Sequence, residues 1–85
     1  MTIRTLMTNE EECKRLEAGE QSFVIRSARD YITKGNLIKF QLMKNGKPVL
    51  NTIQKKLFIV TAVIDSESAP VVEGHQFISF KEVRQ

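Results

Sequence analysis

The chain has 85 residues, the length of a single domain, and 41% of them are hydrophobic, which is enough for a folded core. The longest apolar run is too short to span a bilayer, the N-terminus shows no signal-peptide pattern, and the single cysteine excludes an internal disulfide. We therefore expect one domain over residues 1–85, in a reducing cytoplasm and without a membrane partner.

The net charge of +3 is unevenly distributed along the chain. Residues 1–20 and residues 57–85 each carry a net charge of −2, whereas residues 21–56 carry eight basic side chains against one acid, a net of +7. A basic middle between acidic ends is typical of a surface that binds a polyanion. The alternative is that the lysines form only the solvated face of strands.

The first predicted elements are a strand and a helix. Residues 3–7 are rich in apolar and β-branched residues and favour a strand. Residues 9–18 favour a helix, which we expect Thr8 to cap together with Glu11 in a capping box. Gly19 can adopt the left-handed conformation that ends a helix.

The next segment is an alternating strand followed by a polar loop. Residues 21–27 alternate apolar and polar side chains and predict a strand. Residues 27–34 read as a loop, in which we expect Tyr31 and Ile32 to pack under the rim of a barrel. Residues 34–36 contain Gly35 and are typical of a turn.

The second half of the chain reads as strands joined by turns. Asn45-Gly46, between two apolar stretches, is a strong signal for a hairpin with a type I′ turn. The strands expected around and after it are residues 37–43, 49–53, 57–64 and 76–83. One N-terminal helix with about five to six short strands predicts a small α+β domain, in which the strands form a partly closed β-barrel.

The stretch that follows the predicted helix resembles a known family. Gly19, Ser22, Phe23 and Arg26 stand in an order similar to the motif of ASCH domains, members of the PUA-like superfamily. The closing stretch, residues 74–80, is also similar to the last strand of that family. The chain looks closest to the small phage- and prophage-associated branch, whose function is unassigned.

This resemblance implies a PUA-like β-barrel with a cleft beside the first helix, and RNA or a nucleotide-like ligand. Some members are amidohydrolases that act on an acylated cytidine through a lysine and a threonine of the motif, with a distant glutamate. Here those two positions are Gln21 and Val24, which supply neither an ionisable group nor a hydroxyl. Glu67 or Glu73 could serve as the distant acid. The resemblance thus implies binding without this hydrolysis.

Other candidates for chemistry are few. Cys13 lies on the predicted inner face of the helix, three residues before Leu16, and is expected to be a core residue. His75 has no identifiable acid or nucleophile beside it and is expected at a loop or strand end. We predict no catalytic residue, no metal site and no cofactor.

Basic residues near the motif are the candidates for ligand contact. Arg26 shares a strand face with Ser22, so it either points into the cleft to hold a phosphate or forms an ion pair with Asp30 or a helix glutamate. Arg29 and Lys34 could extend a phosphate-binding rim. If Tyr31 is not packed, it could stack on a base.

The function we expect is a non-enzymatic RNA- or nucleotide-binding module. A first alternative is a small amidohydrolase of acylated or modified nucleosides that uses other residues. A second is a protein adaptor or inhibitor of a phage or mobile element, with the acidic helix as its contact. The predicted ligand-binding residues are Gln21, Ser22, Arg26, Arg29 and Lys34.

Overall fold

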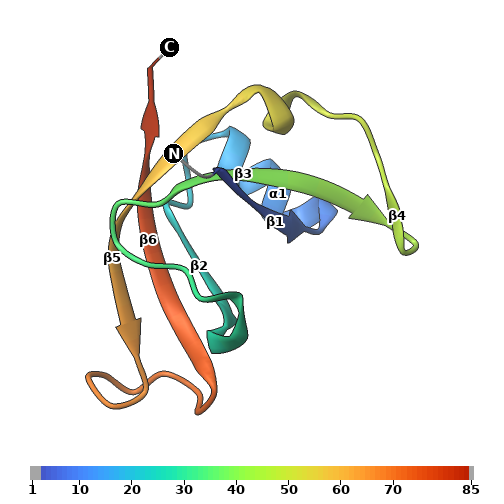
Figure 1. Cartoon of the computed structure of the whole chain (residues 1–85). Helices are drawn as coiled ribbons and strands as arrows, with labels where there is room; N and C mark the ends of the chain where they lie inside the picture. The colour runs from blue at the N-terminus through green and yellow to red at the C-terminus, as the bar shows by residue number, and fades with distance from the viewer. Residues whose placement is uncertain (1–2, 85) are drawn as a thin grey trace.

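A computed structural model describes residues 3–84 of the chain as a small α+β domain with one α-helix and a six-stranded, mostly antiparallel sheet (Figure 1). The predicted α+β class and the single N-terminal helix are therefore confirmed. Two one-turn 3₁₀ helices lie between strands. The elements in chain order are β1 (Ile3–Thr8), α1 (Glu10–Glu17), β2 (Phe23–Ser27), η1 (Ala28–Asp30), β3 (Leu37–Lys44), β4 (Lys47–Pro48), η2 (Thr52–Lys55), β5 (Leu57–Asp65) and β6 (His75–Val83).

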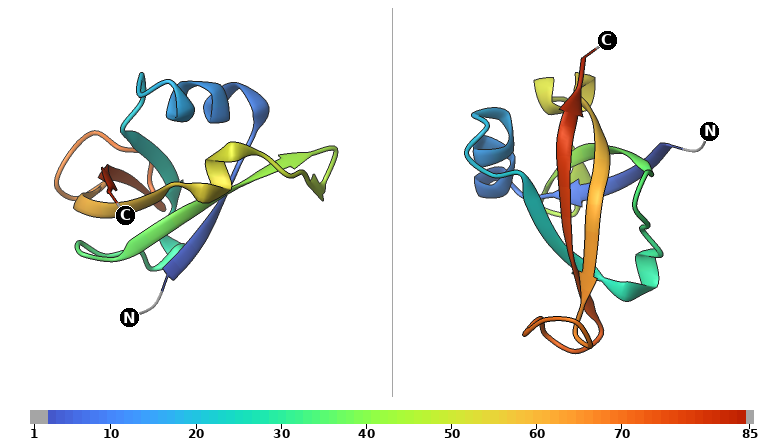
Figure 2. Two further views of the ribbon diagram at one scale, coloured as in Figure 1. Left: turned by 90° about the horizontal axis from the view of Figure 1, so that it is seen from above. Right: turned by 90° about the vertical axis from the view of Figure 1, so that its left-hand side faces the viewer.

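The strands follow the order β1-β3-β5-β6-β2, with β4 paired to the far end of β3. β1 pairs with β3 in parallel, and the other neighbours are antiparallel. The long β5–β6 hairpin runs side by side through the molecule, whereas β3 leaves β5 after two paired residues and turns towards α1 (Figures 1 and 2). A register shift between Val60 and Ala62 interrupts the β5–β6 ladder, and such irregularities bend a sheet.

The expectation of a partly closed barrel is wrong in one respect, because the sheet is not closed. Within residues 3–84, the terminal strands β1 and β2 each pair with one strand only. Two arginine side chains span the gap between them. Arg26 Nη2 on β2 donates to the carbonyl of Met7 on β1 over 2.8 Å, and Arg4 Nη2 on β1 donates to the carbonyl of Asp30 over 2.6 Å. Side chains thus make the contacts that a closed ladder would make with backbone groups.

The start of α1 differs from the predicted capping box by one residue. Asn9 is the cap, and its side-chain oxygen accepts from the backbone N–H of Glu12 over 2.8 Å. Thr8 cannot serve, because it is the last residue of β1, pairs with Leu42 and is buried. Its hydroxyl instead donates to the Glu12 carboxylate over 2.7 Å. Gly19 ends the helix region with the expected positive φ of 74°.

The hairpin at Asn45-Gly46 is confirmed, because both residues have positive φ, at 53° and 76°. The strand expected at residues 49–53 is wrong: β4 ends at Pro48, and the chain enters η2. The Asn51 side chain causes this change, since its oxygen accepts from the backbone N–H of Ile53 and begins the 3₁₀ turn. Ile53 is then fully buried.

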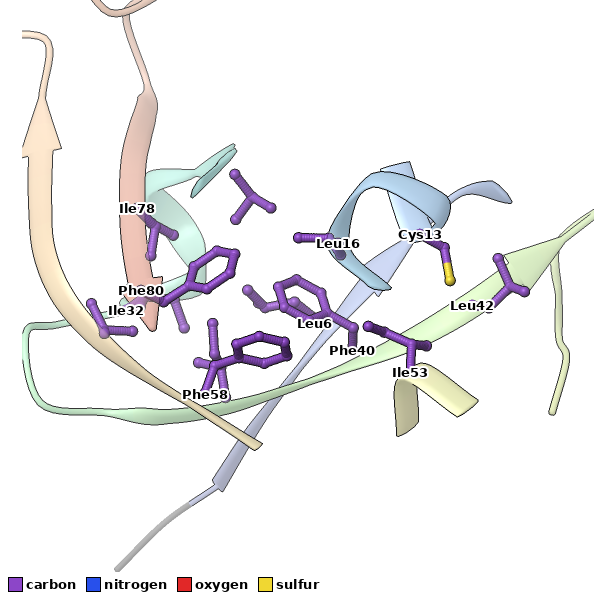
Figure 3. Close-up of a cluster of buried hydrophobic side chains, with 13 residues drawn as sticks. Leu6, Cys13, Leu16, Ile32, Phe40, Leu42, Ile53, Phe58, Ile78 and Phe80 are labelled. Carbon is purple, nitrogen blue, oxygen red and sulfur yellow. The ribbon is translucent and has the colours of Figure 1, made fainter. Parts of the chain in front are cut away.

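The core lies between α1, η2 and the inner face of the bent sheet (Figure 3). β3 alternates as predicted, with Ile38, Phe40 and Leu42 inside. At its centre the ring of Phe40 lies 5.4 Å from that of Phe58 and 5.5 Å from that of Phe80, so three strands meet in one aromatic cluster. Edge-on aromatic contacts of this kind stabilise a core beyond the area they bury.

No helix in residues 3–84 is long and apolar enough to cross a bilayer.

Candidate functional site

A cleft lies beside the first helix. It has a volume of about 330 Å³ and opens at the C-terminal end of α1, where the chain turns into β2. The walls come from the helix end, the start of β5 and the end of β6, which are far apart in sequence. Its lining is residues 16–19, Gln21, Ser22, Lys56, Phe58 and residues 80–82.

The floor of the cleft is apolar. Leu16, Phe58 and Phe80 line it and belong to the hydrophobic core, each less than one-tenth exposed. These side chains are held by β5, β6 and α1, so the floor is rigid. Pockets of this size with an apolar floor and a few polar groups are typical of small-molecule sites.

Two lysines line this cleft, Lys81 on β6 and Lys56, which directly follows η2. Within residues 3–84, Lys56 is the one of the two that forms polar contacts with other lining residues. Its ammonium lies 3.4 Å from the backbone oxygen of Glu17 and 3.4 Å from the carboxylate of Glu82. Both partners also line the cleft, so the ammonium group lies within it. An exposed ion pair such as Lys56–Glu82 is weak and can open to a ligand anion.

The acid of the helix end, Glu17, is held ionised. A hydrogen bond from the Thr52 hydroxyl over 2.6 Å, and a second from the Cys13 thiol over 3.3 Å, lower the pKa of Glu17. Burial, followed by the contact with Glu17, raises the pKa of Cys13 to about 11. The thiol is therefore a protonated core group at neutral pH, as expected for Cys13 from the sequence.

Two of the five predicted binding residues lie at this cleft. Gln21 is fixed, because its side-chain oxygen accepts from Arg15 Nε over 2.7 Å and its nitrogen donates to the carbonyl of Phe23 over 2.6 Å. Ser22 is exposed at the mouth, and its hydroxyl makes no hydrogen bond within residues 3–84. Ser22 is thus available to a ligand.

Arg26 lies away from this cleft, and the structure favours the ion-pair alternative for it. Its guanidinium donates twice to the Glu12 carboxylate, at 2.6 and 3.4 Å, and also to the carbonyls of Met7 and Ile25. Burial alone would raise the pKa of Glu12, but the hydrogen bonds from Arg26 and Thr8 outweigh it and lower that pKa. Arg26 therefore ties β2 to α1 and β1.

Arg29 and Lys34 lie at the other end of β2, on and after η1, so they do not share the cleft with Gln21 and Ser22 (Figures 1 and 2). Both side chains are exposed, as expected for a phosphate-binding rim. Tyr31 between them is 77% exposed, so the expectation that it packs under the sheet is wrong, whereas Ile32 is buried as predicted.

The positions that the resemblance implied for hydrolysis are unsuited to chemistry here. Val24 is 1% exposed and lies in the core, out of reach of a ligand. Glu67 and Glu73 are exposed in the turn between β5 and β6, at the opposite end of that hairpin from the cleft. His75, at the start of β6, is exposed and contacts the backbone oxygen of Glu73. The acids that do line the cleft are Glu17 and Glu82.

An exposed apolar area, the feature expected of a protein adaptor, lies on the outer face of β2 and β6 and not on the acidic helix. Phe23 and Ile25 are 40% and 48% exposed there, and the rings of Phe23 and Phe77 stack 4.9 Å apart. The acidic helix uses Glu12 and Glu17 in internal contacts.

Sequence reasoning missed Lys56, Glu17 and Glu82 because they come from segments whose meeting depends on the fold of the sheet. The only signal available was the polar break at residues 54–56 before a long apolar strand. Within residues 3–84, no group of three or more His, Cys, Asp or Glu side chains could hold a metal ion. Comparisons with known proteins find no family model and no curated protein that matches the chain.

Proposed function

We propose that this protein is a non-enzymatic RNA- or nucleotide-binding module, and that the cleft at the end of α1 holds one nucleotide. The observation that carries the proposal is the Lys56 ammonium inside a cleft whose floor is formed by Phe58 and Phe80. A flat base can lie against the apolar floor while the lysine contacts a phosphate. Ser22 remains available for polar groups of the base or sugar, as does the carboxylate oxygen of Glu82 that has no hydrogen bond within residues 3–84.

We further propose that the domain is an ASCH-like member of the PUA-like superfamily with an open sheet. Three features support this: a short helix ended by Gly19, an edge strand carrying Arg26 straight after it, and a cleft beside the helix. In this proposal the family's reactive positions have become structural. Gln21 fixes the turn into β2, and Val24 fills the core.

The test is a salt titration of binding to short single-stranded RNA, with wild type and Lys56→Gln compared. Removing one phosphate contact should weaken binding about tenfold and reduce the slope of log K against log salt by about 0.7. Lys47→Gln is the matched control, because Lys47 is an exposed lysine of the hairpin, outside the cleft. Equal binding by Lys56→Gln and Lys47→Gln would place the ligand elsewhere, and no RNA binding at low salt would overturn the proposal.

A further inference from the structure

Tyr31 is presented to solvent on a fixed backbone. It follows the one-turn helix η1, and 77% of its surface is exposed. Asp30 precedes Tyr31, and its carbonyl oxygen accepts a hydrogen bond of 2.6 Å from Arg4. Ile32 follows Tyr31, is 1% exposed and is anchored in the core. The chain is thus held on both sides of an aromatic ring that has no core role.

The backbone of Tyr31 is also in a conformation that its side chain disfavours. Its φ of 52° and ψ of 42° lie in the left-handed region, and its N–H donates to the carbonyl of Ala28 over 3.2 Å. Glycine or asparagine occupies this region more easily than a bulky aromatic residue. A strained residue that gains no burial points to a role outside folding.

Exposed cations precede and follow Tyr31 in the same loop. Arg29 precedes Tyr31 by two residues and Lys34 follows it by three, and neither forms an ion pair within residues 3–84. One acid, Asp30, lies in the same loop and is half-buried. An exposed aromatic ring between free cations suits a ligand that offers flat rings joined by anionic groups, which is the chemistry of a single-stranded nucleic acid.

We propose that Tyr31 is a stacking platform for an unpaired base of single-stranded RNA, with Arg29 and Lys34 contacting the phosphates beside that base. This inference rests on the proposed function and adds a second contact point at the opposite end of β2 from the cleft. A single exposed ring is too small a surface for a stable protein interface, which buries about 800 Å² on each partner. Stacking on a base needs only the face of the ring, which the loop leaves free.

The chain offers a direct reporter of this contact. Tyr31 is the only tyrosine and the chain has no tryptophan, so the intrinsic fluorescence of the folded protein comes almost entirely from this residue. Titration with a short single-stranded RNA should quench this fluorescence as the base stacks. Titration with inorganic polyphosphate, which has the charge but no bases, should leave it unchanged. Quenching by both anions, or RNA binding without quenching, would overturn the inference.

Variants separate stacking from a structural role. Tyr31→Ala should weaken RNA binding about 5- to 150-fold, the range expected for loss of one base–aromatic stack, whereas Tyr31→Phe should bind within about twofold of wild type. Tyr31→Asn should lose binding as Tyr31→Ala does, while its melting temperature stays equal or rises, because asparagine tolerates the left-handed backbone. Leu50→Ala, which truncates a side chain that is 89% exposed, is the control and should change neither property.

The two proposals fail in distinguishable ways. If RNA binds and Lys56→Gln weakens it, but Tyr31→Ala does not, the stacking inference is wrong and the cleft proposal stands. If Tyr31→Ala weakens binding and Lys56→Gln does not, the ligand uses the loop and the cleft assignment is wrong. If no RNA binds at low salt, both are wrong.

Discussion

Arg26 and Glu12 form the most shielded of the three salt bridges found in residues 3–84, with side chains 19% and 15% exposed. Bidentate contact fixes the relative position of β2 and α1, and the same guanidinium reaches Met7 on β1. One residue therefore holds three elements together.

Glu12→Gln should lower the free energy of unfolding by about 1–3 kcal/mol, because it leaves a largely buried guanidinium without its charge partner. Urea denaturation at neutral pH measures the change. Glu10→Gln is the matched control, since Glu10 meets Lys44 at 3.7 Å on an exposed surface and should contribute less than about 1 kcal/mol. Equal losses in the two variants would contradict the structural role given to Arg26.

The ion pair of Arg26 with Glu12 also predicts that the free energy of unfolding depends on pH. The pKa of Glu12 is lower in the folded protein than its ordinary value of 4.5, so the folded state binds fewer protons than the unfolded chain near that pH. Its stabilising contribution is fully present above about pH 4.5 and is lost as the pH falls through the folded pKa. The difference in unfolding free energy between wild type and Glu12→Gln should therefore shrink below about pH 4.5. A difference that stays constant down to pH 3 (about one and a half units lower) would refute this.

At the scale of elements, local sequence patterns located most helices and strands. The alternation of β3 and β6 and the positive φ of Gly46 follow from patterns within a few residues. Two predictions were wrong at this scale. The cap of α1 lay where two neighbouring residues could each start the helix, and the strand at residues 49–53 was replaced by a 3₁₀ turn that the Asn51 side chain begins. Thr8 pairs with Leu42 and is therefore part of β1, so Asn9 caps the helix instead.

Asn9→Ala should lower the free energy of unfolding by about 0.5–2 kcal/mol, because the backbone N–H of Glu12 loses its acceptor. Thermal or urea denaturation can measure this change. Glu11→Gln is the control: Glu11 would be essential to a capping box begun by Thr8, but it is exposed and has no hydrogen bond from its side chain within residues 3–84. If Glu11→Gln lowered the free energy of unfolding more than Asn9→Ala does, the capping box of Thr8 and Glu11 would be supported instead.

At the scale of the whole molecule, the sheet has an inner and an outer aromatic cluster. Phe40 is 1% exposed and contacts rings from β5 and β6, whereas Phe23 is 40% exposed and contacts Phe77 on the outer face. Strand alternation predicts that each set of residues shares a face. Which face is inner depends on where α1 and η2 lie.

Phe40→Ala should lower the free energy of unfolding by about 3–5 kcal/mol, because it removes a ring from the centre of the core and leaves a cavity. Phe23→Ala makes the same change on the outer face. It should lower the free energy of unfolding by only about 0.5–1.5 kcal/mol, because it removes the stacking contact with Phe77. Chemical denaturation of the two variants compares them. Similar losses would mean that the outer face is covered in solution.

The sequence alone determined the α+β class, the order of most elements and the residues that share each strand face. These properties depend on periodicity and turn chemistry over a few residues. Only the tertiary structure decided the partner of Arg26, the open edges of the sheet, the exposure of Tyr31 and the meeting of Glu17, Lys56 and Glu82. Each of these depends on contacts between segments tens of residues apart, and local patterns do not encode such contacts.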